Sequence, residues 1–329
     1  MIKNKKTIII SILSLVIIVL AILTEYEIKK EAIFKGKMII LEQEGSAENI
    51  VEINVDTNEE IIYYVDFEAI DVEDVYINDS DQSIYAFGTL WNEDKQTLDT
   101  KLLWYNGKTK EKTVATFNDG HGDIISNNNS FYPIQIINGK DSKIQILVVG
   151  YEDDNCLIID VDILKGDVSQ QKIFHNIIGT DVKYNNIYKA GSNVVYINRL
   201  EELYLYDEIN NKMIFIDKNV LHCKLSLDGN ILLFSKKNLF GDEILCKYNI
   251  KLRTASIVKR LLPMNGFADF SCERSDSEQI YYTKYRKGLG RLVNSSAKKN
   301  MSCWVVRGVY EKNLKEYKGY NSGCKSFVY

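Results

Sequence analysis

One pattern of turn and strand recurs five times along the chain, and this repetition constrains the fold more than any other feature. In each copy, a cluster of small polar residues precedes a short strand rich in Ile, Val, Leu, Tyr and Phe. The five pairs of turn and strand are 78–83 with 84–87, 138–143 with 144–147, 190–193 with 194–197, 228–230 with 231–234, and 274–279 with 280–283. Many short strands between turn signals indicate a sandwich, barrel or propeller, and a repeat of this length favours the propeller.

Each copy continues into further strands, which predicts four-stranded antiparallel units. The next strands are expected at 102–105, 157–160, 203–206, 244–247 and 304–307, and a polar turn with a fourth strand usually closes the unit. Residues 37–65 supply three strands with none before them, and residues 323–329 supply one with none after it. These ends predict a sixth blade that joins both termini, because such closure removes the exposed edges of an open array.

The fourth unit holds the most distinctive segment, Leu225–Ser235, which reads LSLDGNILLFS. It resembles the S-P-D-G-x-x-I-A-F-S signature of TolB-type and related WD-like six-bladed propellers, with Leu227 in place of the proline. Tyr206 followed by Asp207 is similar to the end of the third strand in those proteins, and Tyr248 followed by Asn249 is a weaker copy. The resemblance implies a propeller over residues 37–329. It implies no activity, since such propellers serve as docking platforms, sensors and enzyme scaffolds.

Residues 7–23 form an apolar run without a charged side chain. A helix rises about 1.5 Å per residue, so this run would cover roughly 25 Å, close to the thickness of a bilayer core. Lysines at positions 3, 5 and 6 precede it. The positive-inside rule therefore predicts a cytoplasmic tail over 1–6, a signal-anchor helix over 7–23, a linker over 24–36 and an extracytoplasmic domain. A cleaved signal peptide is the alternative, although no small-x-small cleavage site follows the run.

Charge and cysteine content narrow the function classes. The net charge of −4 becomes −7 without the three N-terminal lysines (−4 minus 3). An acidic domain is a poor match for nucleic acid or for an anionic membrane surface as its main ligand. The 6 cysteines lack the close spacing of a redox or zinc motif. We expect mostly buried free thiols, with one or two disulfides that involve Cys303 or Cys324 as the alternative.

Three long connections hold the candidate binding residues. With the strands of a blade lettered a to d from the centre outwards, the b–c and d–a connections leave one face, called here the long-loop face. The a–b and c–d turns leave the opposite, short-turn face. Long segments at 88–100, 118–129 and 284–300 all belong to the long-loop face. Because long loops on a rigid scaffold commonly carry function, this face is the expected binding face.

The candidate partner-binding residues share these connections. They are Trp91, Asp119, His121, Asp123, Tyr285, Arg286, Arg291 and Lys298. The basic group around 286–299 suits a phosphate, a carboxylated glycan or an acidic protein patch, and the neighbouring tyrosines suit stacking on a sugar. Asp119, His121 and Asp123 are weak metal candidates, because a site needs further ligands. No nucleophile elbow, metalloprotease motif or phosphate-binding loop occurs, so neither a cofactor nor a catalytic role is expected.

These observations predict a membrane-anchored, extracytoplasmic, monomeric propeller that binds a protein or a cell-envelope component through its long-loop face. A carbohydrate-active enzyme or lectin on the same fold is the alternative, and two facing carboxylates in the central pocket would favour it. A third possibility is an accessory subunit whose main partner contacts the membrane helix.

Overall fold

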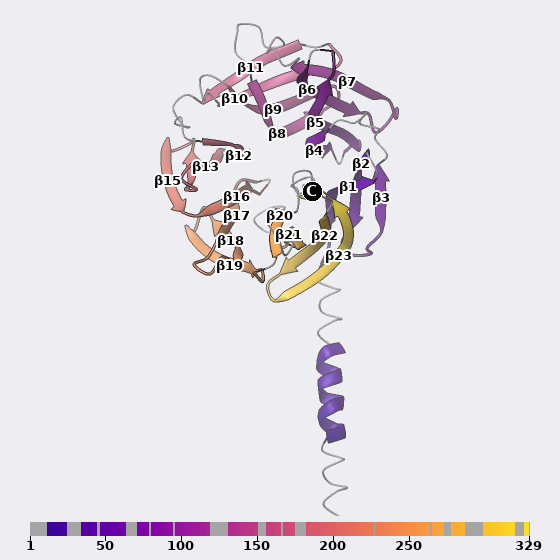
Figure 1. Ribbon diagram of the computed structural model, residues 1–329, viewed down its shortest axis with the longest axis vertical. Coiled ribbons are helices and arrows are strands. Elements are labelled where there is room, and N and C mark those ends of the chain that lie inside the picture. The colour runs from indigo at the N-terminus through magenta and orange to yellow at the C-terminus, as the bar shows by residue number, and fades with distance from the viewer. Residues whose placement is uncertain are drawn as a thin grey trace, which may run out of the picture.

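The fold is an all-β propeller with six blades. The computed structural model describes residues 12–24, 34–44, 47–63, 71–78, 80–94, 96–118, 131–150, 156–165, 167–174, 182–226, 228–263, 265–272, 278–286, 299–319 and 326–328. In these residues the strands form six antiparallel sheets of four strands each. The sheets stand as blades around a common axis (Figure 1). The predicted number of blades and strands is confirmed.

The blades are numbered here in chain order, with strands given from the axis outwards. Blade 1 contains β24 (Ser326–Val328), β1 (Lys37–Glu44), β2 (Ala47–Asn54) and β3 (Glu60–Tyr63). Blade 2 contains β4 (Asp71–Asn78), β5 (Ser83–Asn92), β6 (Thr97–Tyr105) and β7 (Lys112–Asn118). Blade 3 contains β8 (Phe131–Lys140), β9 (Lys143–Gly150), β10 (Cys156–Asp162) and β11 (Asp167–Phe174). Blade 4 contains β12 (Val182–Ala190), β13 (Asn193–Asn198), β14 (Leu203–Asp207) and β15 (Lys212–Asp217). Blade 5 contains β16 (Val220–Leu225), β17 (Ile231–Lys237), β18 (Glu243–Asn249) and β19 (Thr254–Arg260). Blade 6 contains β20 (Asn265–Cys272), β21 (Ile280–Arg286), β22 (Lys299–Arg307) and β23 (Tyr310–Gly319).

The core is divided into six layers, one between each pair of neighbouring blades. The middle strands are therefore apolar on both sides. In β17, for example, all residues from Ile231 to Ser235 are buried. Burial on both sides explains why the repeats read as continuous apolar runs and not as an alternation of apolar and polar residues.

Bulges recur at the same places in the blades. In blades 2 to 6, the pairing of the inner strand with the second strand shifts register once or twice, as between Val72 and Asp74 in blade 2. The pairing of the third and fourth strands in the same blades also shifts once. A bulge bends a strand and increases its twist, so the repeated bulges contribute to the curvature of blades 2 to 6.

The c–d turns of blades 1 to 5 share one kind of side-chain cap on the short-turn face. An Asn or Asp at the end of the third strand accepts hydrogen bonds from backbone N–H groups two or three residues ahead. Asn54 and Asn106 do so in blades 1 and 2, and Asp207 does so from Ile209 and Asn210 at 3.0 and 3.1 Å. These side chains close each turn locally, which is a known role of Asn and Asp.

Blade 1 is closed by both ends of the chain, as predicted. The C-terminal strand β24 is its inner strand, and the C-terminus lies near the axis in Figure 1. Within the described residues, three residue pairs join β24 to β1, whereas seven join the equivalent strands β4 and β5 of blade 2. The backbone closure of blade 1 is therefore short, and side chains reinforce the seam between blades 1 and 6.

An amide clamp fixes the point where the chain enters blade 1. Gln279 of blade 6 accepts a hydrogen bond from the Lys35 N–H at 2.9 Å and donates one to the Lys35 carbonyl at 2.6 Å. The Tyr281 hydroxyl donates to the same carbonyl at 3.2 Å. Phe34 is fully buried in the core between blades 1 and 6, so the propeller begins before β1.

A half-buried lysine reinforces the same seam at the rim. Lys315 of β23 places its Nζ 2.6 Å from Glu42 and 2.7 Å from Glu60, both in blade 1. Burial alone would lower the pKa of Lys315, but the hydrogen bonds and charges of the two glutamates outweigh burial and raise it. The seam is thus held by charge as well as by packing.

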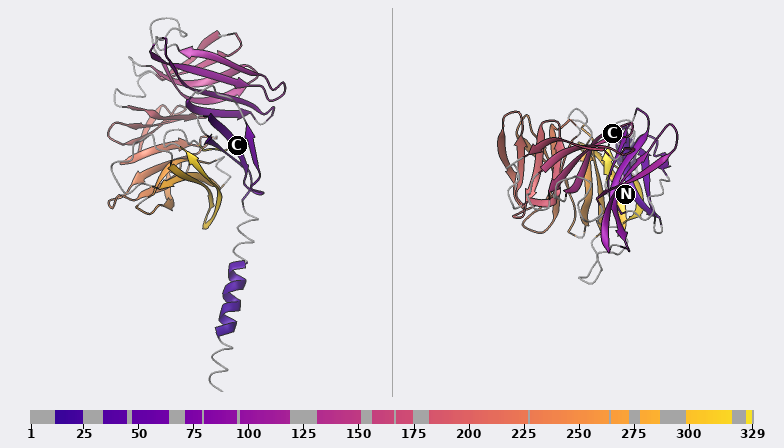
Figure 2. Two further views of the ribbon diagram at one scale, coloured as in Figure 1. Left: turned by 45° about the vertical axis from the view of Figure 1, so that its right-hand side comes forward. Right: turned by 90° about the horizontal axis from the view of Figure 1, so that it is seen from above.

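The N-terminal helix covers residues 12–24, and every one of its side chains is exposed. Figures 1 and 2 show it away from the blades. No helix within the described residues is long and apolar enough to cross a membrane. Residues 7–11 of the expected 7–23 helix lie outside the described ranges.

Four cysteines are free and buried: Cys223, Cys246, Cys272 and Cys303. The expectation of buried thiols is confirmed for these four, and a disulfide through Cys303 is not formed. Burial raises the pKa of the Cys223 and Cys246 thiols, which keeps them protonated and unreactive at neutral pH.

Candidate binding face

The long-loop face carries the connections in which the sequence placed the binding site. Strands alternate in direction within each blade, so the β5–β6, β7–β8 and β21–β22 connections all leave this face. Residues 119–130 and 287–298 lie outside the described ranges. They include Asp119, His121, Asp123, Arg291 and Lys298, whose predicted roles stay predictions. In the described residues, no three His, Cys, Asp or Glu side chains are grouped as a metal site would require.

The expected loop over residues 88–100 is instead an extended hairpin. β5 continues to Asn92 and β6 begins at Thr97, so only a short turn remains between them. Trp91 pairs with Leu98 across the hairpin, and its side chain is 51% exposed. The loop prediction was wrong because the small polar residues here still form ladder hydrogen bonds, but the hairpin presents Trp91 on the long-loop face as expected.

Tyr285 belongs to the packing of blade 6 as well as to its surface. Its ring covers Gly266 on the neighbouring strand, where a Cβ would lie 2.7 Å from the Tyr285 ring and hydroxyl. Burial raises the pKa of the Tyr285 phenol, and the charge of Glu243 raises it further. Arg286 ends β21, and its side chain lies outside the described residues. Only part of the Tyr285 ring is therefore open for contact with a partner.

Two turns on this face have the same construction, which the sequence analysis missed. In the b–c turn of blade 4, Asn198 Oδ1 accepts from the N–H of Leu200 at 3.0 Å and of Glu202 at 2.9 Å. In the b–c turn of blade 5, Asn238 Oδ1 accepts from the N–H of Phe240 and of Asp242, both at 2.9 Å.

The remaining bonds of the two turns also match. In each turn the amide nitrogen of the Asn donates to the carboxylate of the fifth residue, at 2.9 Å in blade 4 and 3.0 Å in blade 5. The fourth residue has a positive φ, 62° at Glu201 and 82° at Gly241. The two turns are therefore rigid and equivalent.

Each of these turns displays an apolar side chain at its third position. Leu200 is 72% exposed and Phe240 is 87% exposed, and Leu239 beside Phe240 is fully exposed. Leu262, in the connection from blade 5 to blade 6, is 75% exposed. The short-turn face also displays single exposed apolar side chains, such as Ile209 and Leu252. Scattered exposed apolar residues are ordinary, and a contiguous group of them marks an interaction surface.

The inner strands carry a polar group that holds neighbouring blades together. Asp74 accepts a hydrogen bond from the Ile136 N–H at 2.7 Å, and Lys224 lies 3.3 Å from Asp269. Burial strongly raises the pKa of Tyr188, and nearby Asp269 and Asp74 raise it further, so both carboxylates lie near this phenol. Both carboxylates bind groups of the adjoining blade.

A second amide clamp joins blades 3 and 4. Gln135 accepts from the Lys189 N–H at 2.9 Å and donates to the Lys189 carbonyl at 3.2 Å. The clamp repeats the chemistry of Gln279 and Lys35 on the other side of the ring. The polar side chains of the inner strands thus have a clear structural role.

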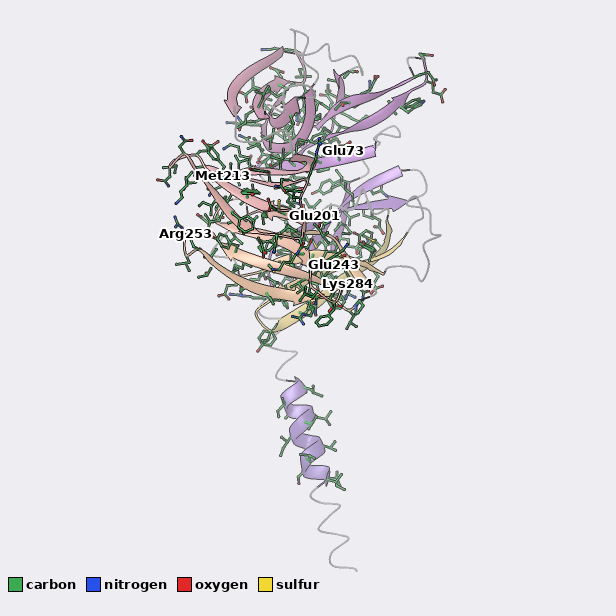
Figure 3. All side chains as sticks on the ribbon, turned by 60° about the vertical axis from the view of Figure 1, so that its left-hand side comes forward. Glu73, Glu201, Met213, Glu243, Arg253 and Lys284 are labelled. Carbon is green, nitrogen blue, oxygen red and sulfur yellow. The ribbon has the colours of Figure 1, made fainter. Side chains whose placement is uncertain are left out.

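A cation lies over an aromatic ring near the junction of blades 5 and 6. The Lys284 ammonium is 3.8 Å from the centre of the Trp304 ring, and burial lowers the pKa of Lys284. Glu311 accepts a hydrogen bond from the Tyr282 hydroxyl and lies 2.6 Å from Lys259 of blade 5. Figure 3 shows Lys284 and Glu243 close together in projection, below Glu201.

The comparisons with known proteins find similarity of fold without similarity of sequence. No protein-family model matches the chain, and no curated protein matches it significantly. TolB from Acinetobacter baumannii superposes with a TM-score of 0.53 and 12% identity, over 89% of this chain and 66% of that one. A protein from Agrobacterium tumefaciens that is also named as a TolB gives a TM-score of 0.50 and 10% identity, over 90% and 98% of the two chains. The fold is a TolB-like six-bladed propeller.

In this TolB-like propeller, the signature segment forms the a–b turn of blade 5. The Ser226 hydroxyl donates to Asp228 at 2.6 Å and accepts from the Ile231 N–H at 2.9 Å. Gly229 has a φ of 68°, and a Cβ there would lie 2.4 Å from the Ala190 carbonyl oxygen of blade 4. The signature therefore records a tight contact between blades on the short-turn face, and it lies away from the candidate binding face.

Proposed function

We propose that the chain is a membrane-tethered extracytoplasmic binding module whose long-loop face docks a protein or cell-envelope component. The observation that carries the proposal is the group of exposed apolar side chains in linked segments of that face, at positions 200, 239, 240 and 262, whereas the short-turn face displays single exposed apolar residues, one to a turn. Binding surfaces need such residues, because burial of apolar area provides most of the free energy of association. The alternative, a carbohydrate-active enzyme, would need free carboxylates at the axis, whereas Asp74 and Asp269 bind neighbouring blades.

The helix over residues 12–24 supports the tether. Its large apolar residues are exposed on every side, for example Leu15 at 63% and Ile22 at 60%. A helix that is apolar all round is normally covered by protein or by lipid. Each such side chain gains about 1.5–3 kcal/mol on full burial, so the free energy favours insertion of this segment into a bilayer.

The entry point of the chain orients the propeller on such a tether. Residues 34–36 precede β1 and lie at the short-turn face, where the Gly36 carbonyl accepts a hydrogen bond from the Val55 N–H of the β2–β3 turn at 2.9 Å. A membrane helix would therefore attach to the short-turn face. The long-loop face would be directed away from the attachment point and remain open to a partner.

Membrane attachment is tested by fractionation of cells that express the full chain. We expect the intact chain to stay with membranes after alkaline carbonate washing, and a C-terminal alkaline phosphatase fusion to be active. The double variant Leu15→Glu and Val19→Glu should be lost from washed membranes. A mature chain that begins after residue 23, found by mass spectrometry, would show a cleaved signal peptide and refute the tether.

The binding face is tested by photo-crosslinking in the same cells. A crosslinking amino acid replaces Trp91 or Arg291 on the long-loop face, and Leu164 in the β10–β11 turn serves as the control because it is 60% exposed on the short-turn face. We expect protein or glycan adducts from the two long-loop positions only. Equal adducts from Leu164, or none from any position, would contradict the proposed docking face.

A further inference from the structure

We propose that Leu200, Leu239, Phe240 and Leu262 form one apolar strip, which inserts into apolar sockets on a protein partner whose rim is acidic. The inference rests on the proposed function of the long-loop face and names the part of the face and the chemistry of its partner. It does not include the long connections around Asp119 and Arg291.

The four residues belong to adjacent segments, which backbone hydrogen bonds link to one another. The Glu201 carbonyl in the first turn accepts from the Val220 N–H at 2.9 Å, and the adjacent Asn219 carbonyl accepts from the Lys237 N–H at 3.4 Å, immediately before the second turn. Beyond the second turn, the Glu243 carbonyl accepts from the Leu261 N–H at 2.9 Å. Leu200, the pair Leu239 and Phe240, and Leu262 thus follow one another from blade 4 to the edge of blade 6.

The conformation of the two turns indicates that they serve to expose their apolar side chains. Glu201 adopts a positive φ, which is unfavourable for a residue other than glycine. The turn gains no core contact in return, because Leu200 is 72% exposed. A polar residue at the third position would keep the Asn hydrogen bonds, which use only the backbone N–H there. The apolar side chains are therefore not needed for folding of the turns.

The charges beside the strip have one sign at the surface. Arg199, Lys237 and Arg260 are exposed and lie within two residues of the apolar positions, and the exposed Lys218 lies in the connection between blades 4 and 5. In the segments 198–202, 217–219, 236–243 and 259–263, four acidic residues are half-buried and Glu243 is buried. Glu202 and Asp242 bind the turn asparagines, Asp217 lies 2.6 Å from Lys236, and Glu243 accepts from the Phe267 N–H at 2.8 Å.

Exposed cations around exposed apolar residues predict the chemistry of the partner surface. Four exposed cations around fully exposed Leu and Phe side chains match apolar sockets surrounded by Asp and Glu. The ring geometry favours a protein over the tethering membrane. The chain enters at blade 1 on the short-turn face, whereas blade 4 stands opposite blade 1 in a ring of six, and the strip lies on the other face. The blade 4 end of the strip is thus on the side of the ring opposite the entry point, and the whole strip lies on the other face.

The test uses the full chain in cells, with a photo-crosslinking amino acid at Leu200 or Phe240. Two matched controls have the same blade and similar exposure on the short-turn face: Ile209 in blade 4, which is 80% exposed, and Leu252 in blade 5, which is 67% exposed. We expect adducts from the strip positions that map, by mass spectrometry, to one protein at apolar residues bordered by carboxylates.

Variants then measure affinity for the protein identified in this way. Phe240→Asp should weaken binding at least roughly thirtyfold, as expected for the loss of a central apolar anchor, while Leu252→Asp should leave it unchanged. Lys237→Glu should mainly slow association and reduce its dependence on salt. Equal urea unfolding midpoints for the two Asp variants would show that the loss is not caused by unfolding.

The other outcomes separate this inference from the proposed function. Adducts from Trp91 but not from Leu200 or Phe240 would refute the strip and leave the docking face standing. Adducts only from Ile209 or Leu252 would refute both. Lipid adducts at Phe240, or binding of phosphatidylglycerol vesicles that Phe240→Asp abolishes, would replace the protein partner with a membrane surface.

Discussion

The seam between blades 1 and 6 is expected to be the point where the ring opens most easily, and Gln279→Ala tests this. The Gln279 side chain is 6% exposed and makes two hydrogen bonds to the backbone of Lys35. At about 1 kcal/mol net for each hydrogen bond, the substitution should cost about 2 kcal/mol. A loss of this size at the seam should increase its opening equilibrium roughly thirtyfold, since each 1.4 kcal/mol is a factor of ten.

Amide hydrogen exchange in β1 measures that opening directly. In the described part of the chain, three residue pairs hold β1 to the inner strand, so loss of the clamp should free β1 before the other blades unfold. Gln135→Ala is the matched control, because Gln135 holds the backbone of Lys189 by the same two hydrogen bonds but lies between blades 3 and 4. Both variants should lose similar global stability in urea, while exchange in β1 should accelerate in Gln279→Ala alone.

A different pattern of exchange would refute this reasoning. If β1 exchanged equally in the two variants, the ring would open without preference for the seam, and the contribution of the short β24 pairing would be larger than assumed. If Gln279→Ala changed neither stability nor exchange, water would replace the amide at no cost, and Tyr281 with the core around Phe34 would be sufficient to hold the entry point.

Three further predictions concern charge, backbone conformation and thiols. Glu42 and Glu60 raise the pKa of Lys315 in the folded state. The contribution of Lys315 to stability is therefore complete below about pH 10.5, the ordinary lysine value, and is lost as pH rises through the higher folded-state pKa. In urea unfolding curves measured at several pH values, Lys315→Met should abolish this loss of stability at alkaline pH. Gly229→Ala should destabilise the fold by more than about 2 kcal/mol because of both its φ and the neighbouring carbonyl, whereas Gly241→Ala, with open space around it, should cost about 1 kcal/mol in urea unfolding. The four buried thiols should resist maleimide in the native state and react in urea, as read by peptide mass spectrometry; rapid native labelling would contradict their burial.

The repeat could be read from the sequence because each turn is closed by its own residues. In the a–b turns, Asp81 accepts from the Ser83 N–H and Asp228 from the Asn230 N–H, and Asp207 and Asn249 cap c–d turns in the same way. Such local hydrogen bonds place similar polar clusters in successive units. The closure of blade 1 could also be predicted, because the three unpaired strands at the N-terminal end and the single one at the C-terminal end together make one four-stranded blade. Local turn chemistry and the number of strands were therefore sufficient to predict the fold from the sequence.

The candidate face could be predicted only in part, because exposure is a tertiary property. Leu239 and Phe240 form a short apolar pair after the polar residues 235–238, and nothing in the sequence shows that both side chains are exposed to solvent. The signal that could have identified them is the match between the segments 198–202 and 238–242, each an Asn followed four residues later by an acidic residue. The inner-strand bulges that bring Asp74 and Asp269 near Tyr188 leave no comparable local pattern.

Asn and Asp side chains close turns on both faces of the propeller, but the closed turns differ in what surrounds them. On the short-turn face, Asn and Asp caps close turns that also meet neighbouring blades, as where Gly229 approaches Ala190 and where Gln279 holds Lys35. On the long-loop face, Asn198 and Asn238 close turns whose third residues, Leu200 and Phe240, are largely exposed. Single apolar side chains at the third position of a capped turn also occur on the short-turn face, as at Ile209, so one such residue does not distinguish the two faces. The long-loop face differs because Leu239 and Phe240 are exposed side by side within one turn, next to the exposed Lys237, which is the composition expected of a binding surface.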